Sequence, residues 1–160
     1  MFRRILVPID GSPTSNRGLD QAIGLALDQK ARICLLHVVD DLIVAGGFDA
    51  MTYIPPNYFD DMIRSLRDRG TKLLARAEAK VRKRGVEVET VLKETLGKRA
   101  ADEIVKHARK WRADIIVLGT HGRRGLSRML MGSDAEWVLR ETPTPVLLVR
   151  SPVGAKKRRA

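Results

Sequence analysis

The stretch from Ala113 to Glu141 constrains the fold more than any other part of the chain. It opens with four consecutive apolar residues, Ile115 to Leu118, which is typical of a strand buried on both faces of a parallel sheet. A loop with three glycines follows, and Gly132 and Ser133 then open an amphipathic helix, with Ser133 as its predicted N-cap. A strand, a glycine loop and a helix N-terminus together present bare backbone N–H groups and a positive dipole end, which can hold phosphate.

The other apolar segments alternate between helical and strand patterns along the chain. Strands are predicted at 3–9, 31–39, 86–93, 115–118 and 146–149, and helices at about 12–30, 57–84, 98–111 and 133–140. Five strands alternating with four helices predict an α/β fold with an open, doubly wound parallel sheet. Residues 86–93 alternate apolar and charged side chains, which suits an edge strand. Residues 40–56 have no clean period and are interpreted as a functional lid or a disordered excursion.

Length and composition indicate one globular domain. A chain of 160 residues, 44% apolar and 31% charged, is expected to form a single domain over residues 1–150, followed by a basic disordered tail at 151–160. Cys34 is the single cysteine, so no internal disulfide can form, and its apolar surroundings predict an inert thiol. No apolar run approaches the roughly 18 residues of a membrane span, and no signal peptide is recognised. The cytoplasm is the expected compartment.

The formal net charge of +11 raises the question of a polyanionic partner. Residues 156–159 supply four of these charges, so the rest of the chain carries 11 − 4 = +7. Such a charge attracts nucleic acid non-specifically, but aromatic residues make up only 4% of the chain and are not interleaved with basic ones. Solvated helix faces and a basic tail are therefore the favoured interpretation, and nucleic-acid binding is not expected.

Three segments resemble the universal stress protein family. The spacing from Gly119 through Gly122 to Gly132 and Ser133 is similar to the family's nucleotide-binding signature, G-x2-G-x9-G-[ST]. Residues 5–12, ILVPIDGS, resemble its first strand and loop, and residues 143–149, PTPVLLV, resemble its last strand. The resemblance covers roughly residues 2–150. It implies the strand order 3-2-1-4-5, ATP binding, and a homodimer formed through Val146–Val149.

The resemblance and a general rule of α/β folds indicate one site. Open parallel sheets bind ligands outside the carboxyl ends of their strands, where the strand order reverses. In the implied order the reversal lies between the first and fourth strands, so residues 8–12 and 119–125 are expected to meet. The predicted nucleotide-binding residues are Pro8, Asp10, Val38, Gly119, Thr120, His121, Gly122, Arg123, Arg124, Gly125, Gly132, Ser133, Asp134 and Ala135.

The chemistry of these residues suggests a role in binding for several of them, and for some it also suggests an alternative role. Backbone N–H groups of the glycine loop and of Ser133 can hold phosphate oxygens. Arg123 and Arg124 either neutralise phosphate charge or are solvated loop residues. By resemblance, Pro8, Asp10 and Val38 line the adenine and ribose side, while Asp10 can also cap its own turn. His121 either donates to a phosphate or ribose or tolerates the turn geometry. Asp134 either complements the helix dipole or helps to hold a Mg²⁺ bridging the phosphates.

The sequence favours nucleotide binding over turnover. It has no P-loop lysine, no G-x-G-x-x-G after the first strand and no spacing typical of a Ser-His-acid or Cys-His nucleophile. No catalytic residue or metal ligand is predicted. The resulting hypothesis is an ATP-binding stress-response protein in which the nucleotide biases conformation or the choice of a protein partner. The alternatives are an interaction protein of the same fold without nucleotide, a slow ATPase, and nucleic-acid binding through residues 156–159.

Overall fold

The computed structural model describes residues 1–40, 56–95, 97–120 and 131–150. In this part of the chain five parallel strands form one sheet in the order β3-β2-β1-β4-β5. The strands are β1 (Arg4–Pro8), β2 (Arg32–Val39), β3 (Val88–Glu94), β4 (Ile115–Gly119) and β5 (Val146–Val149). The helices are α1 (Pro13–Gln29), α3 (Pro56–Lys83), α4 (Ala100–Trp111) and α5 (Ser133–Glu141). The predicted fold class and the implied strand order are both confirmed, and β3 is an edge strand as expected.

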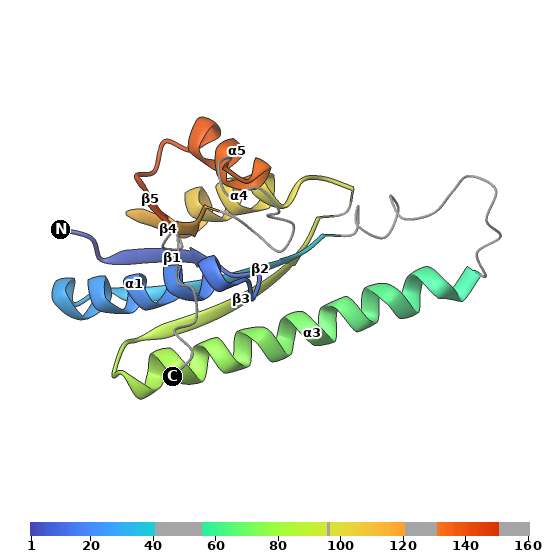
Figure 1. The fold of residues 1–160 in the computed structure, drawn as a ribbon, viewed down its shortest axis with the longest axis horizontal. Helices are drawn as coiled ribbons and strands as arrows, with labels where there is room; N and C mark the ends of the chain where they lie inside the picture. The colour runs from blue at the N-terminus through green and yellow to red at the C-terminus, as the bar shows by residue number, and fades with distance from the viewer. Residues whose placement is uncertain (41–55, 96, 121–130, 151–160) are drawn as a thin grey trace, which may run out of the picture.

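The helices cover both faces of the sheet (Figure 1). Helices α1 and α3 pack on one face, and α4 and α5 pack on the other. The sheet therefore separates two apolar clusters, which is the doubly wound arrangement expected of a parallel α/β fold. The predicted connection and tail lie largely outside the described residues, so the lid at 40–56 and the disorder of 151–160 stay predictions. Among the described residues, no helix is both long enough and apolar enough to cross a bilayer.

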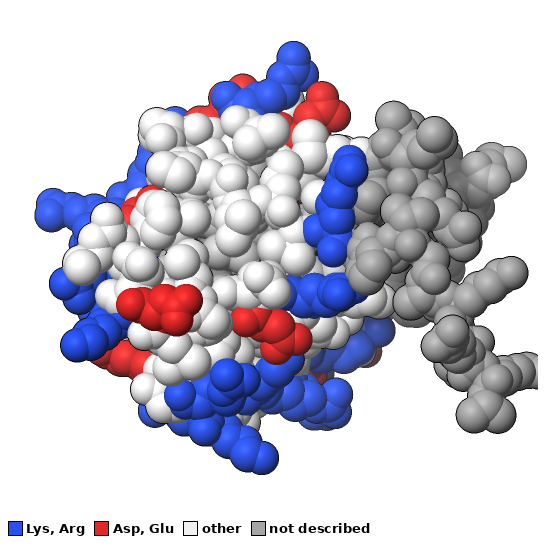
Figure 2. Space-filling model, turned by 60° about the vertical axis from the view of Figure 1, so that its left-hand side comes forward, with Lys and Arg blue, Asp and Glu red and all other residues white. Residues whose placement is uncertain are grey.

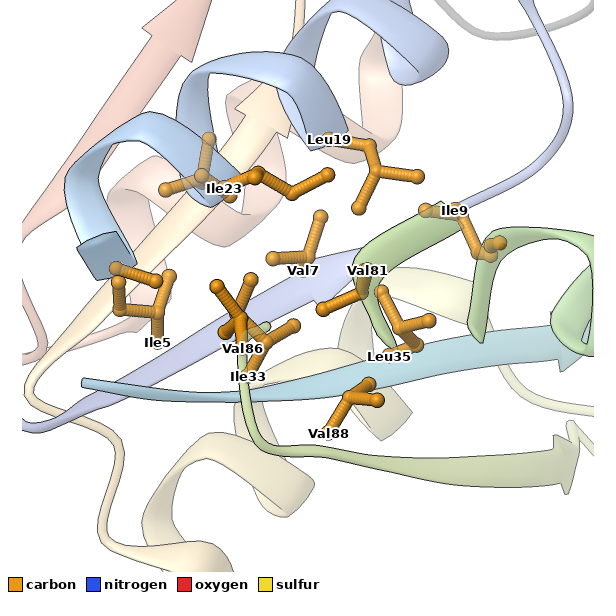
Figure 3. Packing of buried hydrophobic residues seen from close by; sticks show 14 of the residues in the cluster. Ile5, Val7, Ile9, Leu19, Ile23, Ile33, Leu35, Val81, Val86 and Val88 are labelled. Carbon is orange, nitrogen blue, oxygen red and sulfur yellow. The ribbon is translucent and has the colours of Figure 1, made fainter. Parts of the chain in front are cut away.

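The central strand β1 is buried on both faces because its side chains alternate between the two clusters. Ile5 and Val7 point toward α1 and α3, whereas Leu6 packs with the α4 and α5 side, and all three are fully buried. Figure 3 shows the first cluster, in which side chains from β1, β2, α1 and α3 point toward one another. This alternation explains why the sequence of β1 reads as a continuous apolar run rather than as an alternating one.

Helix α3 passes close to the sheet at Gly70. A Cβ atom at this position would lie 2.5 Å from Cδ2 of His37 and 2.8 Å from Cδ1 of Leu92. A glycine in the interior of a helix ordinarily weakens that helix. The structure gives the reason for Gly70, because only a residue without a side chain lets α3 approach β2 and β3 this closely.

Candidate functional site

The carboxyl ends of β1 and β4 lie side by side, and the end of β4 lies close to the start of α1. The two strands pair in parallel, with Leu6 opposite Ile116. A Cβ atom on Gly119, at the end of β4, would lie only 2.9 Å from the carbonyl carbon of Thr14 and from the backbone nitrogen of Ser15. The end of β4 and the first turn of α1 therefore meet at the switch point of the sheet.

The first loop is held by its own polar groups. The Ser12 N–H donates to Oδ1 of Asp10 over 2.9 Å, and the Asp10 N–H donates to Oγ of Ser15 over 3.2 Å. Ser12 is the N-cap of α1, since its Oγ accepts from the Ser15 N–H over 3.2 Å. Gly11 adopts a φ of +82°, which a side chain would strain. Asp10 therefore does cap its own turn, one of the two roles considered for it.

Strand β2 fixes the backbone that leads into this loop. The buried His37 donates from Nδ1 to the Ile9 carbonyl over 2.7 Å, because a carbonyl oxygen can only accept. The Ile9 N–H donates in turn to the Leu36 carbonyl over 2.8 Å. Pro8 is the last residue of β1, buried and opposite Leu36, so its missing N–H falls where strand pairing ends. Val38 is half-buried near the end of β2, with its side chain toward the α4 and α5 face.

The two ends of the glycine loop are joined. The Thr120 N–H donates to the Val149 carbonyl over 3.0 Å, which ties the end of β4 to β5. The Gly132 N–H donates to the Thr120 carbonyl over 2.8 Å. Thr120 is 3% exposed, so this junction is part of the protein interior. The N-terminus of α5 is consequently held beside the end of β4.

Helix α5 begins at Ser133, as predicted, but its N-cap lies one residue earlier than predicted. Gly132, with φ −64° and ψ 145°, is the N-cap, and the prediction that Ser133 is the cap is wrong. The Glu136 N–H donates to the Gly132 carbonyl over 2.9 Å, so Ser133 already belongs to the first helical turn. The helix supplies no acceptor for the N–H groups of this turn, which are the groups that bind anions at helix N-termini. Ser133 and Asp134 are exposed there.

Ala135 contributes to this site differently from its neighbours. Its side chain is 4% exposed and belongs to the cluster that joins α4 and α5 to the sheet. It can therefore offer a ligand only its backbone, while its methyl group anchors the first turn of α5.

Part of the predicted site lies outside the described residues. This applies to His121, Gly122, Arg123, Arg124 and Gly125, whose roles stay predictions. In the described part, the sequence analysis missed Thr14 and Ser15 as residues in contact with the β4 end. Both are buried, and a run of hydroxyl residues directly after the Asp10-Gly11 turn was the signal that could have identified them.

Cys34 is not a reactive group in this structure. Burial and, to a lesser extent, the negative charge of Glu89 raise the pKa of its thiol to about 12. Its Sγ lies 3.5 Å from Nε2 of His107, whose pKa burial and the nearby Lys93 lower. A protonated thiol beside an uncharged imidazole is a poor nucleophile, as the sequence analysis predicts.

Fold and site together define a Rossmann-like α/β domain with its candidate ligand site at the switch point. A family model described as the universal stress protein family matches residues 1–150. Universal stress protein YxiE of Bacillus subtilis is 34% identical over 151 residues, which cover 94% of this chain and 100% of the relative. The chain belongs to the universal stress protein family.

Solved structures agree with this assignment. A universal stress protein family member from Burkholderia pseudomallei is 33% identical, with a TM-score of 0.73 and coverage of 94% of this chain and 97% of that one. The protein MJ0577 of Methanocaldococcus jannaschii superimposes with a TM-score of 0.82, covering 96% of this chain and 99% of its own. Its sequence identity is 24%, so that similarity establishes the fold alone.

Proposed function

We propose that this protein binds ATP between the ends of β1 and β4 and acts as a nucleotide-dependent regulatory protein of the stress response in the cytoplasm. The observation that carries the proposal is the close approach of Gly119, at the end of β4, to Thr14 and Ser15 in the first turn of α1, which directly follows the predicted loop at 8–12. The N-terminus of α5 lies beside the same junction through the Gly132–Thr120 hydrogen bond. Phosphates are the ligands that such helix N-termini favour.

Proteins of the same fold support an adenine nucleotide as the ligand. Structures with this fold include an Arabidopsis thaliana protein with AMP bound, with 21% identity and a TM-score of 0.66. Another is a universal stress protein from Archaeoglobus fulgidus in complex with dAMP, with 23% identity and a TM-score of 0.62. A further universal stress protein is in complex with cAMP, with 23% identity and a TM-score of 0.61. The choice of ATP for this chain rests on the spacing of its glycine signature.

Binding without efficient turnover is part of the proposal. The Asp10 carboxylate accepts a hydrogen bond from the Ser12 N–H, and the Ser12 and Ser15 hydroxyls accept bonds that hold the same loop. These groups therefore stabilise the loop and are not assigned the role of a base that activates water. A catalytic base would have to lie within hydrogen-bond reach of the attacking nucleophile.

The test is a calorimetric titration of the nucleotide-stripped protein with ATP, with and without Mg²⁺. A Gly122→Val, Gly132→Val variant should bind at least about tenfold more weakly, because the new side chains would obstruct the approach of phosphate to the backbone. Gly24→Val is the matched control, since a Cβ at Gly24 on α1 meets nothing within 4 Å. Titrations with ADP, AMP and cyclic AMP define the preference.

Each outcome of this titration separates two functions. Saturable binding that the loop variant loses and the control keeps supports the nucleotide proposal. Phosphate release at a steady rate from the wild-type complex would instead make the protein a slow ATPase. The absence of binding by the stripped wild type would overturn the proposal in favour of an interaction protein that needs no nucleotide.

We also propose a homodimer formed through β5. This strand is the outer strand of the sheet on the β4 side, so its outer backbone groups lack a partner strand in the described chain. Leu147 on the same strand is 38% exposed. Pairing with a second copy would cover both features.

A further inference from the structure

A groove of about 790 Å³ lies at the amino ends of the strands, at the opposite end of the sheet from the candidate nucleotide site. It is lined by the start of β1 and β2, the C-terminal end of α1 and the residues that precede β3 and β4. This volume falls within the range of small-molecule sites, about 300–1,000 Å³.

Basic side chains from three elements line this groove. Arg4 is the first residue of β1 and Arg3 precedes it, Lys30 is the C-cap of α1, and Arg32 is the first residue of β2. The acidic lining residues are Glu87 and Asp114, so four basic and two acidic side chains belong to the lining residues. Figure 2 brings this end of the molecule forward and shows more Lys and Arg than Asp and Glu side chains on the visible surface.

The Asp114 carboxylate already interacts with Arg3 and Arg4. Its Oδ2 accepts from the backbone N–H groups of Arg3 and Arg4 over 2.8 and 2.9 Å, and its Oδ1 lies 3.8 Å from Nη2 of Arg4. Burial disfavours the charged carboxylate, but the two backbone hydrogen bonds and the Arg4 charge outweigh it and lower the pKa of Asp114. Asp114 and Arg4 thus form a pair, which leaves Glu87 as the other lining carboxylate beside three further basic side chains.

The other basic side chains of the groove have no ion-pair partner in the part of the chain that the structure describes. Within the described ranges, neither the Arg3 guanidinium nor the Lys30 ammonium has a carboxylate at ion-pair distance. The Arg32 guanidinium lies 5.5 Å from the ring centroid of Trp111 and likewise makes no ion pair there. Other basic residues of the same molecule are paired, including Arg67 with Glu94 and Lys80 with Asp20.

We propose that this groove binds a small oligophosphate anion, separately from the proposed nucleotide site. Arginine and lysine side chains recognise phosphate oxygens by charge-assisted hydrogen bonds, and cations on three different elements suit an anion with several phosphate groups. The groove has the volume of a small-ligand site, and none of its lining residues is aromatic, so it offers no aromatic surface for nucleic-acid bases.

The test uses the full-length chain and sodium triphosphate as the probe, titrated calorimetrically at low and at physiological salt. The groove variant Arg3→Gln, Lys30→Asn, Arg32→Gln removes three charges; asparagine tolerates the left-handed φ of 51° at position 30. The matched control Arg69→Gln, Lys72→Gln, Arg76→Gln removes three charges from exposed positions of α3. The groove variant should bind triphosphate at least about tenfold more weakly, and the control should stay within about twofold of wild type.

Triphosphate can also enter the proposed nucleotide site, so the titration is repeated with the Gly122→Val, Gly132→Val variant. We expect this glycine-loop variant to retain triphosphate binding, and we expect the groove variant to retain ATP binding. Equal losses in the groove variant and its control would show a net-charge effect and overturn the proposal. Loss of triphosphate binding in the glycine-loop variant alone would also overturn the proposal. So would a wild type that binds an oligonucleotide but not triphosphate.

Discussion

Gly119 ends β4 at the point where the candidate site is most crowded. Its Cβ position lies 2.9 Å from two backbone atoms of Thr14 and Ser15, and neither of these can rotate away as a side chain could. We therefore expect Gly119→Ala to lower the free energy of unfolding by about 1–3 kcal/mol, the usual cost of overpacking. Urea denaturation measures this change, and the ATP titration of the same variant shows whether the loops have moved apart.

Gly24→Ala is the control for this substitution. Gly24 lies inside α1 with nothing within 4 Å of its Cβ position, so alanine should raise stability by about 0.5–1 kcal/mol through its better helix propensity. Wild-type stability in Gly119→Ala would contradict the close approach of α1 and β4.

The residue scale also shows what the sequence could not reveal. The glycine spacing identified Gly119 as a candidate for ligand approach, but its contact with Thr14 joins segments more than 100 residues apart in sequence. The His37 hydrogen bond to Ile9 and the space left by Gly70 are equally non-local. Such contacts depend on how layers pack, which no local pattern encodes.

The elements themselves were predictable because each depends on a local pattern. Helical and strand periodicities placed the helices and strands close to their observed bounds, and α3 ends at Lys83, shortly before Gly85 with its φ of +77°. The strand order came from the family resemblance, because parallel crossovers fix handedness but not which strands become neighbours. The N-cap of α5 was misplaced by one residue, since Gly132 and Ser133 are both acceptable caps.

Asp114 joins two elements, because it precedes β4 and accepts hydrogen bonds from the backbone at the start of β1. Its folded-state pKa lies below the ordinary value of 3.8, so the stabilisation is present above that value and is lost as the pH falls through the folded-state pKa. We expect Asp114→Asn to cost at most about 1 kcal/mol at neutral pH, because the carboxylate is partly exposed and screened.

The pH dependence distinguishes charge from hydrogen bonding at this position. Asparagine keeps an oxygen that can accept from both N–H groups, so the stability difference from wild type should shrink as the pH is lowered below 3.8. Asp114→Ala removes the acceptor and should stay less stable than Asn at every pH. Urea denaturation from pH 7 downward measures both, and a constant wild-type–Asn difference would contradict a role for the charge.

At the scale of the whole molecule, topology determines where charge accumulates. All five strands are parallel, so their first residues and the C-terminal end of α1 lie at one end of the sheet. Arg3, Lys30 and Arg32 meet there although the sequence presents them only as part of a total of +11. The predicted topology contained this information, because parallel strands place all their amino ends at the same edge.

The same topology leaves β5 as an outer strand, which makes the proposed homodimer testable. Sedimentation equilibrium of the wild type should give twice the 17.9 kDa of one chain. Leu147→Lys should shift the protein toward the monomer mass, because a lysine on an edge strand disfavours pairing with another chain. Leu27→Lys is the control, since Leu27 on α1 is 42% exposed and Leu147 is 38% exposed, so both changes add one charge to a comparable surface position. A wild type that remains at 17.9 kDa at every concentration, or a Leu27→Lys variant that dissociates as readily, would exclude β5 as the dimer interface.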